Sequence, residues 1–445
     1  MNTWPVRLSP VTLAIVLVAF SAVAGPALGQ GIALRGASAV NDSMGGASVA
    51  APIDSAGAIH WNPASISGLP ASDMSFGMEL ILPTTELSSR IGAGALGGGF
   101  PPVTLQGSTQ GEPGVTAVPS MAFVRKQEGS PWSYGLGMFG IGGSSVNYPA
   151  SLTNPILTPQ PPNGLGLGRL SANVDVLQVV PTVAYELSPK LSVGFAPTLT
   201  MGRIFAAPLF LGAKDDMDLD GFGTYPAGVG TRYAWGGGFQ AGVYYNTDSC
   251  WHFGASLKSP QWMEPFRFNT EDQLGNPREV RFRLNYPLIA SIGASYTGFE
   301  KWILACDLRY FDYANTTGFG PEGMTPQGAL TGLDWNNVFA VAIGAQRQLN
   351  DCLFVRVGYC FNENPIDSFA SQFNVASPLI IKHSLHTGFS YVFADNWMFS
   401  LTYVHCFENE VTGPLHGGPL GVIPNTSVTS TVSADALSMG LSKRF

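Results

Sequence analysis

Charged residues are scarce in this chain of 445 residues: Lys, Arg, Asp and Glu together make up 12%, about half of the roughly 25% found in ordinary soluble domains. The net charge is -8, with only 22 Lys and Arg. Because nucleic-acid phosphates require clustered positive charge, no nucleic-acid partner is expected. Hydrophobic residues still reach 45% beside 54 glycines and 33 prolines, which excludes a disordered chain of low hydrophobicity.

Long apolar runs are also missing after residue 29. No segment there reaches the about 18 consecutive apolar residues that indicate a transmembrane helix. Before that point, Arg7 precedes an apolar run over 11–24, and small residues lead up to both Ala24 and Gly29. This pattern is typical of a secretory signal. We therefore predict a signal peptide over 1–29, cleaved after Ala24 or Gly29, and an exported mature chain.

Cysteines and enzyme motifs are few. The 5 cysteines are an odd number, so they form no disulfide framework. The zinc-protease, Walker A and G-x-S-x-G motifs do not occur, and neither an enzyme nor a cofactor is expected. Asp216, Asp218 and Asp220 match the start of a calcium loop, but Ala227 stands where that loop needs a bidentate Glu. Calcium bound by these three carboxylates and a solvated acidic loop are the two alternatives.

What the chain does contain, from residue 71 onward, is alternation of apolar and other residues with period two, the pattern of half-buried strands. We expect about fourteen strands, with short turns alternating with long loops as in outer-membrane barrels. They begin near residues 71, 116, 131, 171, 190, 231, 250, 279, 299, 335, 352, 380, 396 and 431. A closed barrel pairs every backbone group in hydrocarbon while half of its side chains stay polar. We predict an all-β, antiparallel transmembrane β-barrel over 71–445 in the cell outer membrane.

The C-terminus supports the same prediction. The last strand alternates and ends in Phe445, and a terminal aromatic residue on such a strand resembles the assembly signal of outer-membrane barrels. This resemblance implies the barrel-assembly machinery as a partner, in addition to outer-membrane lipid.

Residues 30–70 do not alternate and are rich in small residues. Their composition fits either a flexible leader or a plug inside the barrel lumen. A Gly-rich stretch, then Asp54 and the triplet Asn62-Pro63-Ala64 just before the first strand, resembles the FadL/TodX family of outer-membrane transporters for hydrophobic compounds. Further likenesses lie at 236–245 and 351–365, and the resemblance covers residues 30–445.

The resemblance implies a fourteen-stranded barrel in which 30–70 forms an N-terminal hatch inside the lumen, with Asp54, Asn62, Pro63 and Ala64 among its residues. It also implies passive uptake of long-chain fatty acids or aromatic hydrocarbons. In that scheme the hydrophobic ligand is captured by apolar loops, passes to a lumenal pocket and leaves sideways through a kinked third strand. A general diffusion porin and a structural outer-membrane barrel are the alternative functions.

Two sets of residues fit this scheme. Gly135, Gly137 and Gly140 lie in the third expected strand, where glycine weakens the ladder and permits a bulge; tight turning at a barrel corner is the alternative. The second set is cationic: Arg281, Arg283 and Arg356 fall on the inferred lumen faces. A fatty-acid carboxylate needs a cationic partner once it leaves water, although lumenal charges also brace barrel walls.

Overall fold

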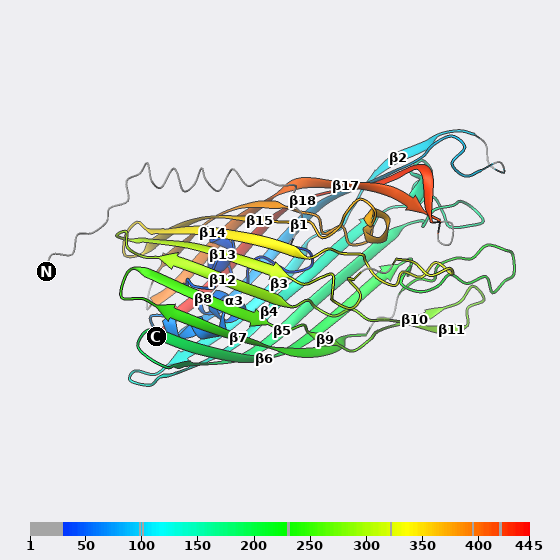
Figure 1. Ribbon diagram of the computed structural model, residues 1–445. Helices are drawn as coiled ribbons and strands as arrows, with labels where there is room; N and C mark the ends of the chain where they lie inside the picture. The colour runs from blue at the N-terminus through cyan, green and yellow to red at the C-terminus, as the bar shows by residue number, and fades with distance from the viewer. Residues whose placement is uncertain are drawn as a thin grey trace.

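The computed structural model describes residues 30–97, 99, 102–228, 232–320, 323–393, 396–417 and 421–445. Fourteen antiparallel strands close into a barrel, with the last strand paired to the first (Figure 1). The predicted fold class is confirmed. The predicted signal peptide over 1–29 lies outside the described residues.

The strands of the barrel wall are β1 (Asp73–Ile91), β3 (Thr116–Lys126), β4 (Trp132–Tyr148), β5 (Leu170–Glu186), β6 (Leu191–Ala207), β7 (Ala234–Asn246), β8 (Trp251–Lys258), β12 (Ile289–Tyr296), β13 (Trp302–Phe311), β14 (Val338–Gln348), β15 (Leu353–Asn362), β16 (His383–Val392), β17 (Trp397–His416) and β18 (Val422–Arg444). Four further strands extend beyond this ring: β2 (Leu105–Gln110) on β1, β9 (Trp262–Met263) on β7, and the hairpin of β10 (Phe266–Glu271) with β11 (Pro277–Phe282). The helices are α2 (Ala39–Ser43), α3 (Ser55–Trp61) and the short 3-10 segments η1 (Pro63–Gly68), η2 (Pro155–Leu157) and η3 (Ser371–Asn374). Within the described ranges, no helix has the length and apolar character needed to cross a membrane.

Strand alternation gives the wall two different faces. On β1, Phe76, Met78 and Leu82 are exposed on the outside, whereas Ser75 and Glu79 are buried on the inside. The same holds around the barrel, where the exposed apolar side chains include Phe195, Leu199, Phe239, Val243, Phe253, Ile292, Leu308, Phe339, Leu385, Phe399 and Leu441. An apolar outside around a polar inside is the arrangement of a membrane barrel.

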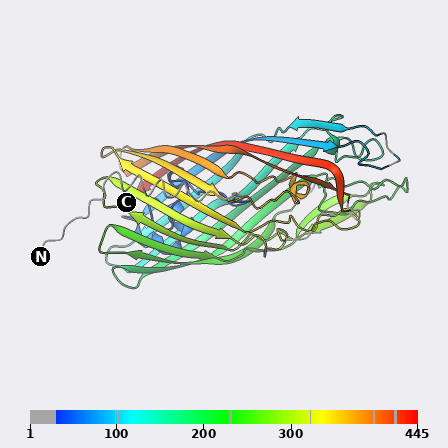
Figure 2. The same cartoon turned by 45° about the horizontal axis from the view of Figure 1, so that its top comes forward.

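The two ends of the barrel differ. The short turns and the C-terminus lie at one end, whereas β2, the β10–β11 hairpin and the long connections extend from the other (Figures 1 and 2). In outer-membrane barrels the short turns are periplasmic and the long loops extracellular. These two terms are used for the two ends below.

One expected strand was placed wrongly. The strand expected from residue 279 is two elements: β11 in the extracellular hairpin, and the wall strand β12, which starts only at Ile289. Between them the buried positions change from even to odd numbers, since Tyr286 and Ser291 are both buried. Pro287 lacks the N–H that a continuous ladder needs. A single uninterrupted alternation was therefore the wrong interpretation here.

A second difference concerns the last strand, which was expected to begin near residue 431. β18 already begins at Val422, and β17 before it continues to His416. The outward side chains of this stretch, such as Thr429 and Thr431, are polar. A strand that rises above the hydrocarbon does not need an apolar outer face, so hydrophobic alternation alone underestimated its length.

The segment over residues 30–72, called the lumenal segment here, lies inside the barrel near its periplasmic end (Figure 1). α2 begins after Ser38, whose side chain accepts the N–H of Asn41 at 3.0 Å, the usual N-cap interaction. α3 ends at Trp61 because Asn62 has an extended backbone, as expected for a residue that precedes proline. All residues of both helices are buried.

Candidate functional site

A buried ion pair fastens the lumenal segment to the wall. Asp307 and Arg309 of β13 are paired at 2.9 Å between Oδ2 and Nη2, and their side chains are 1% and 0% exposed. The same Asp307 oxygen accepts the backbone N–H groups of Ser48 at 2.8 Å and Val49 at 3.1 Å. The Arg309 guanidinium lies over the ring of Trp61. Both partners of the pair thus hold the segment as well as each other.

The triplet Asn62-Pro63-Ala64 joins the segment to β7. The Asn62 side-chain N–H groups donate to the carbonyl oxygens of Val49 at 2.8 Å and Val243 at 2.9 Å. Its Oδ1 accepts the N–H of Ala64 at 3.1 Å, and Pro63 is the first residue of η1. Only an amide side chain supplies two donors and one acceptor in this way.

Asp54 occupies the N-cap position of α3 but bonds elsewhere. Its Oδ2 accepts the hydroxyl of Ser38 at 2.6 Å. Burial raises the pKa of Asp54 to about 6, against the lowering effect of the Ser38 hydrogen bond. All four residues expected in a hatch therefore lie in the lumenal segment. Asp54 also links α3 to Ser38, the N-cap residue of α2.

Glycines on the inner face of the wall leave the space that the lumenal segment occupies, and this set is called the glycine seat here. Sequence reasoning missed this role. A Cβ at Gly194 would lie 2.2 Å from the Ala64 nitrogen, and one at Gly242 would lie 2.1 Å from the Asn62 Oδ1. The segment is also the nearest contact at Gly254, Gly344 and Gly358. The available signal was glycine at inward positions of strands, which marks close approach of another backbone.

The wall has a gap between β3 and β4. Their ladder ends at the pair Ser120 and Phe139, although β4 continues to Tyr148. The next connection lies closer to the extracellular end, where the Ser145 hydroxyl donates to the Pro113 carbonyl at 3.2 Å. Between these points, no β3–β4 ladder pair occurs in the described part of the chain.

A bulge and the start of the lumenal segment lie at this gap. The register of β4 with β5 shifts between Gly140 and Gly142. The extra residue, Ile141, turns its carbonyl inward, where it accepts the N–H of Leu34 and the hydroxyl of Tyr286, each at 3.0 Å. A β-bridge between Ala33 and Gly142 completes the contact. The chain that precedes α2 therefore pairs with the barrel at the place where the wall is interrupted.

The three glycines expected at a kink divide into two groups. Gly140 lies at the bulge, and a Cβ there would lie 2.3 Å from Val118 Cγ1. Gly135 and Gly137 lie on the regular part of β4, and a Cβ at either would lie 3.0 Å from Ile59 of α3. These two leave room for the lumenal segment.

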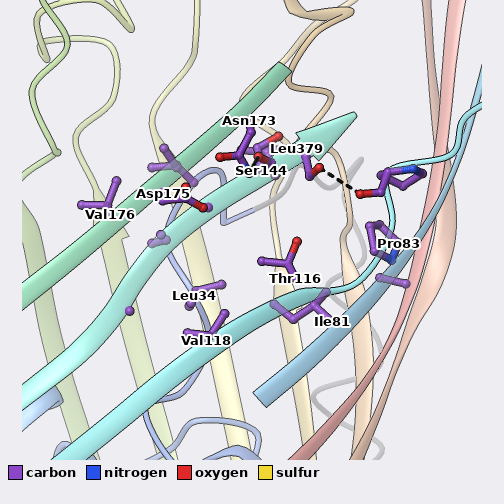
Figure 3. A pocket seen from close by; sticks show the side chains of 18 of the residues that line it. Leu34, Ile81, Pro83, Thr116, Val118, Ser144, Asn173, Asp175, Val176 and Leu379 are labelled. Carbon is purple, nitrogen blue, oxygen red and sulfur yellow. Dashed lines mark hydrogen bonds between the residues drawn. The ribbon is translucent and has the colours of Figure 1, made fainter. Parts of the chain in front are cut away.

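A cavity of about 840 Å³, called the wall cavity here, occupies the gap. Leu34, Ile81 and Val118 line it on one side, and Asp175 of β5 lines it across the gap (Figure 3). Its lining combines residues inside the barrel, such as Leu34 of the lumenal segment, with residues on the outward faces of β5 and β6, such as Asp175 and Arg203. The wall cavity therefore passes from the lumen through the wall.

The sequence profile described as outer membrane protein transport protein (OMPP1/FadL/TodX) matches residues 18–445. The chain belongs to this family. The expected family, transport function and outer-membrane location are thereby confirmed. No curated protein matches the chain.

Solved structures of family members share the fold. The toluene transporter TodX of P. putida has 16% sequence identity and a TM-score of 0.66, with 93% of this chain and 99% of that chain covered. The toluene transporter TbuX of Ralstonia pickettii has 17% identity, a TM-score of 0.66 and coverages of 93% and 99%. A Pseudomonas aeruginosa FadL homologue has 12% identity, a TM-score of 0.67 and coverages of 93% and 100%.

The three expected ligand-binding arginines are not brought together. Arg281 and Arg283 are exposed in or beside the extracellular β11, where Arg281 donates to Glu279 at 2.6 Å. The expectation that these two face the lumen was wrong, because the wall strand begins only at β12. Arg356 does face inward from β15, but it lies on the periplasmic side of the lumenal segment, away from the wall cavity.

The three aspartates considered for calcium lie close together in an extracellular loop. Oxygens of Asp216, Asp218 and Asp220 lie within 4.8 Å of one another, and all three residues are exposed. Backbone N–H groups of the same loop donate to them, from Gly221 to Asp216 at 3.2 Å and from Phe222 to Asp220 at 2.8 Å. Backbone donors of the loop thus meet part of the hydrogen-bonding capacity of these carboxylates.

Proposed function

We propose that this outer-membrane transport protein takes up small uncharged hydrophobic compounds, holds them in the wall cavity and releases them sideways between β3 and β4. The observation that carries the proposal is the wall cavity itself, which is lined from both faces of the wall at an interruption of the ladder. A ligand leaving there would enter the hydrocarbon of the membrane without crossing the lumenal segment, which serves as the hatch.

The charges of the wall cavity support an uncharged ligand. Its charged lining residues are Arg35, Asp175 and Arg203. Arg203 and Asp175 form an ion pair at 2.9 Å on the outer side. Burial acts to lower the pKa of Arg35, but the nearby Cys406 thiol and Glu79 carboxyl group raise it above its ordinary value. A ligand carboxylate would find Arg203 already paired with Asp175, and an uncompensated buried charge is costly.

The extracellular surface supports capture of such ligands. Val103 and Leu105 beside β2, and Leu165 in the loop after β4, are 55%, 44% and 52% exposed. Exposed apolar side chains of this kind mark binding surfaces. TodX and TbuX are toluene transporters, and we extend this class of ligand to the present chain.

A matched pair of ligands tests the proposal. Toluene and benzoate share one ring and differ in charge. We expect proteoliposomes that contain the protein to take up labelled toluene faster than empty vesicles, and to bind benzoate at least about tenfold more weakly than toluene, as expected for an uncompensated buried carboxylate. Equal or tighter binding of benzoate would overturn the assignment of an uncharged ligand.

A reversible cross-link tests the route. A Cβ at Gly140 would lie 3.6 Å from the Val118 Cβ, within the range of roughly 3.5–4.5 Å that disulfides require. In the double variant Val118→Cys, Gly140→Cys, oxidation should slow toluene uptake and reduction should restore it. The wild type and each single variant, treated with the same oxidant, control for the native cysteines. Unchanged uptake by the fully cross-linked protein would exclude this gap as the exit.

A further inference from the structure

A second cavity, of about 690 Å³, opens under the lumenal segment at the periplasmic end. The segment contributes 50–53 to its lining, and the wall contributes Arg356 of β15 and Arg444 of β18. Lys301, in the turn between β12 and β13, lies at its edge. This periplasmic cavity has no part in the proposed route of the hydrophobic ligand.

Arg356 is the unusual residue of this cavity. Its side chain faces inward and the residue is only 4% exposed. Its Nε donates to the Gln346 Oε1 and its Nη1 to the Ser390 Oγ, each at 2.6 Å. A guanidinium has five N–H donors, so these two neutral partners use only some of them. Among the described residues, no carboxylate lies within ion-pair distance of Arg356.

Buried charges are normally paired, because a lone charge is poorly solvated away from water. Arg356 instead lines a space large enough for a small molecule. Among the described residues of that lining, the other charged side chains are Lys301, Arg444 and Asp351, so cations outnumber acids in this set although the whole chain carries a net charge of -8. Arg444 is already engaged, because its Nη2 donates to the Ile53 carbonyl at 2.8 Å.

We propose that the periplasmic cavity is a binding site for a small anion, a carboxylate or a phosphate, held by the free N–H donors of Arg356. Planar guanidinium donors suit both groups because they bind two oxygens at once. Lys301 at the edge attracts the anion from the periplasm. Since 50–53 forms the opposite side of the cavity, a bound anion also bridges the lumenal segment and the wall.

Calorimetric titration of the full-length mature protein in detergent tests the site. The probes are hexanoate, inorganic phosphate and the uncharged control hexanol, with chloride keeping the ionic strength constant. We expect at least one anion to bind and hexanol not to bind at this site. Arg356→Gln should weaken the binding by about tenfold or more, as for loss of a charge-assisted hydrogen bond. Binding of hexanoate but not phosphate identifies a carboxylate site, and the reverse a phosphate site.

Two further variants keep the test decisive. Lys301 is exposed in its turn, so Lys301→Gln should fold normally and weaken anion binding a few-fold even if Arg356→Gln does not fold. Arg90→Gln alters an exposed arginine at the extracellular end of β1 and should leave the binding unchanged. The proposal is overturned if neither anion binds the wild type, or if Lys301→Gln and folded Arg356→Gln bind as tightly as the wild type.

Discussion

The guanidinium carbon of Arg309 lies 3.4 Å from the centroid of the Trp61 indole ring. A strand of the barrel and the last residue of α3 thus meet through a cation–π contact deep inside the lumen. Because Arg309 is also paired with Asp307, its side chain contacts both a wall carboxylate and the Trp61 ring of the lumenal segment. Such contacts are strongest where water is excluded.

Replacing Arg309 should therefore destabilise the protein strongly. Arg309→Met leaves Asp307 buried without its partner, which typically costs about 3–5 kcal/mol. The midpoint of guanidinium unfolding should fall accordingly. Arg347 also lies over a tryptophan, Trp302, but it is exposed, so Arg347→Met is the matched control and should shift the midpoint little. Equal midpoints for the two variants would contradict the anchoring role of Arg309.

The glycine seat predicts a different defect. Gly242→Ala and Gly194→Ala introduce a Cβ within 2.1 Å and 2.2 Å of the lumenal segment, so the segment should be displaced while the wall still closes. We expect larger single-channel currents in planar bilayers and faster proteolysis of residues 30–72. Gly440→Ala is the control, because its nearest contact would be an ordinary 3.4 Å. Wild-type currents in all three variants would show that the segment does not depend on this seat.

Asp54 predicts a pH dependence. Burial raises its pKa to about 6 from an ordinary 3.8, so the folded protein binds this proton more tightly than the unfolded chain. The resulting stability is complete below about pH 4 and is lost as the pH rises through about 6, and the upper limit is about 3 kcal/mol.

Unfolding midpoints between pH 4 and 7 measure this effect. Asp54→Asn should have a flatter profile than the wild type and greater stability at pH 7. Asp218→Asn removes an exposed loop carboxylate instead and should keep the wild-type profile. A profile of Asp54→Asn that parallels the wild type would show that another group is responsible.

Tyr286 predicts a local effect at the bulge. Tyr286→Phe removes one of the two hydrogen bonds to the Ile141 carbonyl and leaves the one from Leu34, a loss of about 1 kcal/mol. Amide hydrogen exchange should quicken in the peptides that contain Leu34 and Ile141. Tyr225→Phe, which removes a hydroxyl bonded to Gly328 in the extracellular loops, should leave those peptides unchanged.

The sequence predicted most of the wall because alternation is a local property of each strand. It failed between Val280 and Ile289, where Pro287 interrupts the ladder and the inward face changes from even to odd positions. Arg281 was therefore assigned to the lumen although it is exposed outside the wall. Arg356, on an uninterrupted strand, was assigned to the correct face.

The site was less predictable, because its parts come from distant segments. The glycines of β4 indicated an irregularity, but the position of the bulge at Ile141 depends on Leu34 and Tyr286, which are remote in sequence. The glycines that contact the lumenal segment cannot be told from turn glycines by residue type alone. Their inward positions on strands indicate close approach of another backbone, but the sequence does not show that this backbone is the lumenal segment.

The seam between β1 and β18 has a consequence for assembly. Asp73 and Arg444 face each other at its periplasmic end, and each also holds the lumenal segment: Asp73 accepts the N–H of Ser55 at 3.0 Å, and Arg444 donates to Ile53 at 2.8 Å. Pairing of the first strand with the last therefore also completes the contacts that hold the lumenal segment. A nascent barrel in which β1 and β18 have not yet paired lacks one of these two contacts, so we expect closure of the wall and fixation of the lumenal segment to occur together.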